Sequence, residues 1–196
     1  MGRTDFTFRS ARNACARAHC LLSGMKLETA AGWQPVERLA AGMAVQTYDG
    51  GLRPIVDLKK VNVGAMLLEF FPEGLTLIPG GALHNCEPFY VIPSQEILLR
   101  DQAVMEVSGE TAALIRAELL EGTRGITRSL PVDELTMIIL SFDEEEIVWA
   151  NTVALLACAG LKASPGFFPR LQPGESLRVA SRLKDVEAGA FDVLAA

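Results

Sequence analysis

The sequence predicts a compact, mainly β fold with one short internal helix and a C-terminal helix. The first observation is a series of short apolar segments between residues 26 and 63, separated by turn signals. These signals are Ala31-Gly32, Ala41-Gly42 and Asp49-Gly50-Gly51. Turns at intervals of about 8 to 12 residues are typical of all-β domains. The second observation is the length of 196 residues with 49% hydrophobic residues, which is enough for a sizeable core in one medium domain.

In chain order, residues 1–19 are rich in Arg, Ala, Ser and Asn and show no β period. They predict a mobile or weakly helical leader. Residues 67–78 and 88–99 continue the short β segments, the second as a pair of apolar strands. The strongest hairpin signal is Asp49-Gly50, because Asp-Gly favours the tight turn of a short hairpin loop.

The internal helix is predicted at residues 110–121. Ala113, Leu114, Ala117 and Leu120 follow one another at spacings of one, three and three residues, and a glycine follows as a stop signal. This pattern indicates an amphipathic helix of about three turns.

The last third of the chain contains two apolar runs, at residues 137–142 and 147–156, on either side of the four acidic residues 143–146. They predict two buried strands joined by a solvated, charged turn, which is a more common role for such an acidic run than a metal site. Prolines at 165, 169 and 173 then precede a predicted helix at residues 175–184.

Charge and composition exclude several classes of function. Asp and Glu number 24 against 18 Lys and Arg, which argues against a nucleic-acid partner. No apolar run reaches the roughly 18 residues needed to span a bilayer, and no secretory signal is evident, so we expect no membrane partner. The four cysteines are irregularly spaced, which favours reduced thiols and a cytoplasmic location, although export by a non-classical route stays open.

Four separated stretches carry the most specific pattern in the chain. They read CLLSGMKLETAAGWQPVERLAAGMAVQTYDGG from Cys20, IPGGALHNCEP from Ile78, VIPSQEILL from Val91 and FDEEEIVWANT from Phe142. In order and spacing they resemble the bacterial Hedgehog/intein-like subgroup of the Hint (Hedgehog/intein) domain family, a self-processing module. The resemblance implies a pseudo-symmetric β horseshoe in which the first cysteine lies beside the strand that carries the family's block histidine. It divides the chain into a leader (1–19), a Hint-like domain (20–166) and a partly helical C-terminal extension (167–196).

The resemblance also implies a chemistry for Cys20. In the family, the first cysteine attacks the preceding peptide bond, so Cys20 would attack the carbonyl of His19 and form a thioester. The leader would then be an intramolecular substrate. This acyl shift needs an acid to protonate the leaving nitrogen, and a free thiol with a pKa of about 8.5 also needs help to ionise at neutral pH.

Several polar positions of the family pattern are changed in this sequence. Gln95 stands at the block histidine and Ile92 at the preceding Ser/Thr, while Glu145 stands at the second histidine. Met25 and Met43 stand where the family usually has Thr and Asp. Loss of one general acid typically slows a reaction about 10²- to 10⁴-fold. The sequence therefore predicts a degenerate, catalytically impaired active site.

Other residues could replace the missing groups. His19 and His84 could act as the acid, with an ordinary pKa of about 6.5. Glu145 or Glu96 could do so if burial raised the pKa of the carboxyl group. Asn151 matches the family asparagine, but the chain continues for 45 residues beyond it, so a hydrogen-bonding role in a turn is expected instead of terminal cyclisation.

Three hypotheses follow for the function. The favoured one is a degenerate Hint domain that is retained as a structural or protein-interaction module, with an unknown protein as partner. The alternative is an active, single-turnover autoprocessing domain that cleaves before Cys20. A third is a thiol-based metal or redox site around Cys20 and Cys86. The spacing of the cysteines and histidines matches no standard zinc motif, so neither a metal nor a cofactor is expected.

Overall fold

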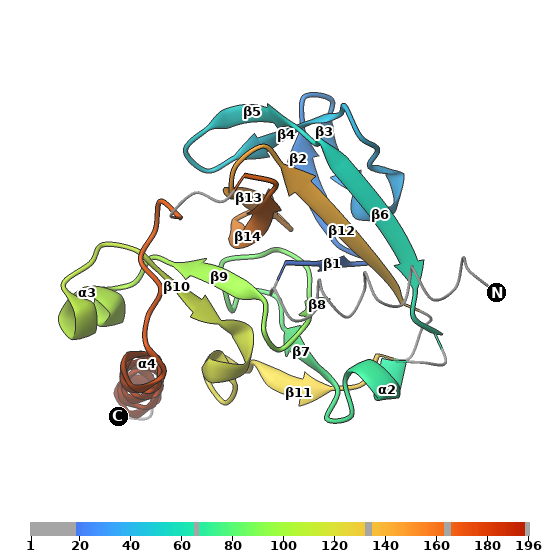
Figure 1. Ribbon diagram of the computed structural model, residues 1–196. Coiled ribbons are helices and arrows are strands. Elements are labelled where there is room, and N and C mark those ends of the chain that lie inside the picture. Colours follow the sequence, from blue (N-terminus) through green and yellow to red (C-terminus); the bar gives the residue numbers. More distant parts are fainter. Residues whose placement is uncertain (1–18, 65–66, 132–134, 163–165, 195–196) are drawn as a thin grey trace.

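The computed structural model describes residues 19–64, 67–131, 135–162 and 166–194, and its fold is mainly β (Figure 1). The strands are β1 (Leu21–Leu22), β2 (Lys26–Thr29), β3 (Gly32–Pro35), β4 (Ala44–Thr47), β5 (Gly51–Pro54), β6 (Asp57–Asn62), β7 (Leu75–Ile78), β8 (Phe89–Val91), β9 (Glu96–Leu99), β10 (Ala113–Arg116), β11 (Thr127–Ser129), β12 (Thr136–Phe142), β13 (Glu146–Ala150) and β14 (Ala154–Gly160). The helices are η1 (Val36–Arg38), α2 (Leu67–Phe70), α3 (Gln102–Ser108), η3 (Ala117–Leu120) and α4 (Pro173–Leu194). The predicted leader lies outside the described residues, except for its last residue, His19.

Most strands belong to one large, strongly bent sheet. Its main path is β1-β12-β14-β13-β2-β4-β5, and β3, β6, β9 and β10 pair alongside this path. A small separate sheet has the order β11-β7-β8. Helices α3 and α4 contact each other beside β9 and β10, at the end of the molecule opposite β5 (Figure 1). The predicted mainly β architecture is therefore confirmed.

The core is built from apolar side chains of nearly every strand. One large cluster extends from β1 to α4 and includes Cys20, Leu27, Ile92 and Leu156. A second, smaller cluster lies around Leu98 and Leu155, where β9 and the β13–β14 hairpin meet. None of the described helices is both long enough and apolar enough to cross a membrane.

The prediction of a helix at residues 110–121 is wrong. Residues 113–116 form β10, which pairs antiparallel with β9, and only residues 117–120 form a short turn of 3-10 helix. Ala113, Leu114 and Ile115 are all buried, so this segment is covered on both faces and not along a single helical stripe. Pairing with β9 therefore overrides the helical spacing of the apolar residues.

The internal α-helix with a complete pair of caps lies slightly earlier in the chain, in α3. The Asp101 side chain accepts a hydrogen bond from the Ala103 N–H at 2.9 Å, and Gly109 ends the helix with a φ of 78°. These are the usual start and stop signals of a helix. The predicted C-terminal helix is confirmed but is longer than expected, because α4 starts at Pro173, a residue suited to a first helical position.

The strand boundaries near the acidic run differ in part from the prediction. Residues 137–142 lie in β12 as expected, but residues 147–156 are two strands joined by a turn at Asn151 and Thr152. Both turn residues have positive φ, 43° and 92°. The predicted Asp49-Gly50 hairpin is confirmed, because these residues join the paired strands β4 and β5.

Candidate functional site

The His19–Cys20 bond leads directly into β1, the short strand that joins the edge of β12. Leu21 pairs with Ile138 and Leu22 with Met137, which fixes this end of the chain against the sheet. The Cys20 side chain is only 2% exposed and belongs to the main hydrophobic core. The thiol that would act as nucleophile therefore lies inside the domain.

Gln95 lies beside the residue that precedes this cysteine. The carbonyl oxygen of Ala157 in β14 accepts a hydrogen bond from Gln95 Nε2 at 2.9 Å and one from His19 Nδ1 at 3.4 Å. Gln95 Nε2 also donates to the carbonyl oxygen of Glu96 at 3.0 Å. The Gln95 side chain is fully buried, and its Oε1 has no hydrogen-bond partner among the described residues. Gln95, which the sequence aligns with the block histidine, thus lies next to His19 and presents a neutral amide there.

Two carboxylates and a guanidinium complete a group that we call the His19 cluster: His19, Glu96, Glu145 and Arg170. The nearest ligand atoms of His19, Glu96 and Glu145 all lie within 4.8 Å of one another. Arg170 donates to Glu96 from Nε, at 2.8 and 3.1 Å from the two carboxylate oxygens, and from Nη2 at 2.9 Å, and it also pairs with Glu145. The acidic run is therefore not uniformly solvated, because Glu145 is partly buried and paired.

Burial, more than the charges of the cluster, determines the protonation of His19. Burial lowers the pKa of His19, and this effect exceeds the opposing influence of Glu96 and Glu145, while Arg170 lowers the pKa further. Burial also disfavours the charge on Arg170, but hydrogen bonds to Glu96 and Glu145 outweigh it, so the pKa of Arg170 is raised. Imidazolium, the form of His19 that could protonate a leaving nitrogen, is therefore scarce at neutral pH.

The three possible ligand groups of the cluster could in principle hold a cation. Arg170 already supplies positive charge to both carboxylates. A metal ion would therefore have to displace the guanidinium from these carboxylates. Without a metal ion, Glu96, Glu145 and Arg170 form an ion-pair network in which the arginine offsets part of the negative charge.

Replacing Arg170 with glutamine is expected to raise the pKa of His19. The substitution removes a cation that disfavours imidazolium and leaves Glu96 and Glu145 free to stabilise it. An NMR pH titration of the two imidazoles measures this shift, with His84 as an internal reference.

A matched control is Arg178→Gln, which removes an exposed arginine from α4. It should leave the titration of His19 unchanged. A pKa of His19 that is unchanged or lower in Arg170→Gln would contradict the described electrostatics.

Asn151 is not part of the His19 cluster, and its hydrogen bonds connect the β13–β14 turn to Lys26 of β2. Its Oδ1 accepts from the Lys26 N–H at 2.8 Å, and its own N–H donates to the carbonyl oxygen of Lys26 at 3.0 Å. Its carbonyl oxygen accepts from the Cys86 N–H at 3.2 Å. Asn151 sits in the turn of the β13–β14 hairpin, whereas Ala157 pairs with Ile147 further along the hairpin. These contacts are those of the expected turn residue.

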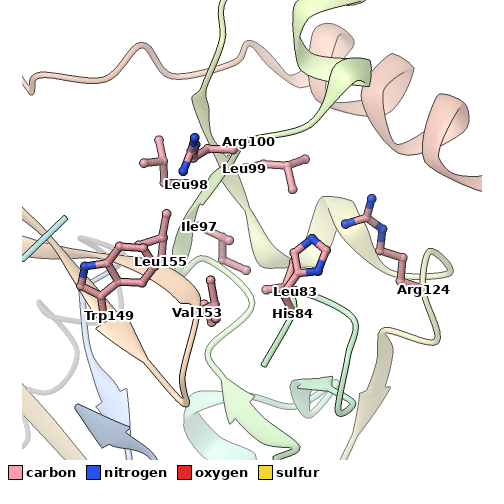
Figure 2. A pocket seen from close by; sticks show the side chains of 11 residues that line it. Leu83, His84, Ile97, Leu98, Leu99, Arg100, Arg124, Trp149, Val153 and Leu155 are labelled. Carbon is pink, nitrogen blue, oxygen red and sulfur yellow. The ribbon is translucent and has the colours of Figure 1, made fainter. Parts of the chain in front are cut away.

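His84 also lies away from the cluster. It is exposed and lines a cavity next to Arg124, Val153 and Trp149, as Figure 2 shows. The cavity involves the turn end of the β13–β14 hairpin, where Val153 and Ala154 contribute to its wall. The structure therefore brings together four of the residues named from the sequence, with Cys20 adjacent to the first of them in the chain: His19, Gln95, Glu96 and Glu145.

Arg170 is the residue of the His19 cluster that the sequence analysis did not identify. It lies in the proline-rich segment before α4 and reaches the cluster because it forms a parallel bridge to Leu114 of β10. No local motif marks it, since its partners are 74 and 25 residues away in the chain.

The three cysteines of the described residues form no disulfide with one another and lie in different environments. Cys20 and Cys158 are buried and Cys86 is exposed. Burial raises the pKa of the Cys158 thiol, and the nearby carboxylates Glu145 and Glu146 raise it further. Cys158 therefore remains protonated at neutral pH and is not a nucleophile.

Comparison with known protein families matches residues 19–156 to the Hint domain. The chain belongs to the Hint domain family. The match begins at His19, the residue before the cysteine that starts the family pattern. This Hint domain is thus related to the self-processing modules of the family, as the sequence motifs predicted.

Solved structures of intein and intein-like domains match this chain. A bacterial intein-like domain from Clostridium thermocellum matches with a TM-score of 0.50 and 11% identity, over 71% of this chain and 98% of that one. This likeness supports the fold of the Hint domain. The MchDnaB-1 intein has a TM-score of 0.47 and 12% identity, over 71% of this chain and 100% of its own. A splice-inactive variant of the AceL NrdHF class 3 split intein has a TM-score of 0.44 and 14% identity, over 74% and 99%. A search of curated proteins gave no significant match.

Proposed function

We propose that this chain is a Hint domain with impaired cleavage of the His19–Cys20 bond, in which the fold serves as a structural or protein-interaction module. The observation that carries the proposal is the state of Gln95. Its amide Nε2 donates to the carbonyl oxygens of Glu96 and Ala157, at 3.0 and 2.9 Å. A carboxamide cannot transfer a proton to a leaving nitrogen at neutral pH, so the position beside His19 provides no general acid.

The changed positions around the nucleophile support the same proposal. Met25 and Ile92 stand where the family usually has polar residues, and both are fully buried in the same hydrophobic core as Cys20. The backbone N–H of Leu22 lies 3.5 Å from the Met25 sulfur. At these two positions, polar side chains that could polarise the His19–Cys20 peptide bond are thus replaced by apolar side chains that pack in the core.

The competing function, autoprocessing before Cys20, would need a proton donor from the His19 cluster. His19 is neutral at pH 7 because burial lowers its pKa. The side chains of Glu96 and Glu145 are both engaged in ion pairs with Arg170. The described groups near the bond are therefore poorly suited to acid catalysis.

Intact-mass measurement of the purified protein tests the proposal. Hydroxylamine and dithiothreitol attack a thioester but not an ordinary peptide bond, so they reveal an acyl shift. We expect the full-length mass of 21.1 kDa to persist with both reagents, in the parent and in Cys20→Ala alike.

A fragment that begins at Cys20 and is absent from Cys20→Ala would overturn the proposal and establish autoprocessing. Cys86→Ala is the matched control, because it removes an exposed thiol outside the core. Zinc at one equivalent in the purified protein, lost in Cys86→Ala, would favour a thiol-based metal site instead.

A further inference from the structure

A cavity of about 240 Å³ lies between β9, the turn end of the β13–β14 hairpin and the loops that carry His84 and Arg124 (Figure 2). Its apolar wall includes Ile97, Leu99 and Leu155, all nearly fully buried. The cavity is smaller than the roughly 300 to 1,000 Å³ of sites for drug-sized molecules. It can therefore take a small apolar group.

Nitrogen-bearing side chains surround this apolar wall. Arg100, Arg124 and His84 contribute to the lining, and no acidic side chain of the described residues does. In Figure 2 the His84 ring and the Arg124 guanidinium lie on one side of the space, the Trp149 indole lies on the other, and Arg100 lies above them. This positive lining occurs in a protein with a net charge of −6, so it is a local feature and not a general one.

Arg100 and Arg124 differ in the partners they already have. Arg124 Nη2 forms an ion pair with Asp101 at 2.6 Å. Arg100 has no carboxylate within 4.0 Å among the residues that the structure describes, and its Cζ lies 5.4 Å from the centre of the Tyr48 ring. Stacking on an aromatic ring orients a guanidinium but leaves its charge uncompensated. Arg100 is thus oriented and available to pair with an anion.

The backbone holds two of the lining residues in an unusual conformation. His84 has a φ of 62° and Arg124 a φ of 49°, in the left-handed region that favours glycine. This conformation is strained for a residue other than glycine, and retained strain of this kind clusters at ligand sites. Its presence on one side of the cavity is consistent with a binding role for the side chains there.

We propose that the cavity binds a small ligand that combines an apolar body with a carboxylate. Arg100 pairs with the carboxylate through its planar guanidinium, and the apolar body lies against Trp149, Val153 and Leu155. The ligand could be a free carboxylic acid or the C-terminal residue of a peptide, because both present the same chemistry. The proposal gives a chemical class of ligand to the binding module suggested above, and it holds whether or not the His19–Cys20 bond is cleaved.

Titrations followed by 1H–15N NMR test this proposal with two probes and a neutral control. The probes are octanoate, for a free acid, and N-acetyl-leucine, for a C-terminal residue; N-acetyl-leucinamide lacks the carboxylate. We expect at least one acid to bind with a Kd of about 1 mM or tighter. Its shifts should centre on residues 97–100 and 149–155, and N-acetyl-leucinamide should bind at least about tenfold more weakly than N-acetyl-leucine if the latter is the ligand that binds.

Comparing Arg100→Gln with a second charge-removing variant distinguishes specific binding at this cavity from the effect of changing the net charge. Arg100→Gln should weaken binding of the acid by about tenfold or more, because it removes a charge-assisted hydrogen bond. Arg178→Gln removes the same charge from the exposed face of α4 and should leave the affinity unchanged. Absence of binding by both acids, or equal affinity in the parent and Arg100→Gln, would overturn the proposal. Neither result depends on the cleavage assay, so failure here is distinguishable from failure of the proposed loss of processing.

Discussion

Replacing Gln95 with histidine is expected to accelerate cleavage of the His19–Cys20 bond by about 10²- to 10⁴-fold. The effect corresponds to roughly 3 to 5 kcal/mol of activation free energy. The sequence motif aligns Gln95 with the family's block histidine, and the Gln95 and His19 side chains both contact the carbonyl oxygen of Ala157. An imidazole at this place would lie beside the residue that carries the scissile carbonyl and could protonate the leaving nitrogen.

The measurement is the rate at which the full-length mass is converted into the fragment that begins at Cys20, with dithiothreitol present. The double variant Gln95→His/Cys20→Ala is the control, and it should remain intact because it lacks the nucleophile. Gln95→Asn is a second control, because it keeps an amide at this position without adding an acid.

The neighbouring residue Ile92 provides a stricter form of the experiment. It is fully buried and stands at the family's Ser/Thr position, so Ile92→Thr combined with Gln95→His restores two polar groups of the pattern. We expect the combination to cleave at least as fast as Gln95→His alone. Intact protein in both variants, with a folded NMR spectrum, would show that Gln95 is not what limits cleavage.

Much of the fold could be predicted from the sequence because its signals are local. The Asp49-Gly50 turn specifies a hairpin through its own backbone preferences, and the pair β4–β5 follows from it. The failure at residues 110–121 has the opposite cause. The apolar spacing there fits a helix, but the alternative partner, β9, lies elsewhere in the chain, and only the assembled sheet shows that both faces are covered.

The candidate site divides in the same way. Gln95 and Glu145 could be found because each stands in a recognisable motif, and the structure places both near His19. Arg170 could not be found, because a lone arginine after a proline carries no pattern. Its role depends on the packing of the segment before α4 against β10. The sequence could therefore propose Gln95 and Glu145 as site residues, but not the arginine that pairs with Glu145.

Replacing Gly160 with alanine is expected to lower the free energy of unfolding by about 3 kcal/mol. Gly160 ends β14 and pairs in parallel with Phe142 of β12. A Cβ at this position would lie 2.5 Å from the carbonyl carbon of Glu144 and from the backbone nitrogen of Glu145. These are backbone atoms, so relief of the clash requires the turn that carries Glu145 or the end of β14 to move. For a domain of this size, we expect the midpoint of thermal unfolding to fall by roughly 6 to 12 °C.

Gly174→Ala is the matched control, because it adds the same methyl group at the start of α4, where no atom lies within 4 Å. Alanine favours a helix over glycine, so this variant should be as stable as the parent or more stable by up to about 1 kcal/mol. Thermal unfolding followed by circular dichroism measures both variants. Equal midpoints for Gly160→Ala and Gly174→Ala would contradict the close approach of β14 to the acidic turn. A loss confined to Gly160→Ala would support the close backbone approach of β14 to the turn that carries Glu145.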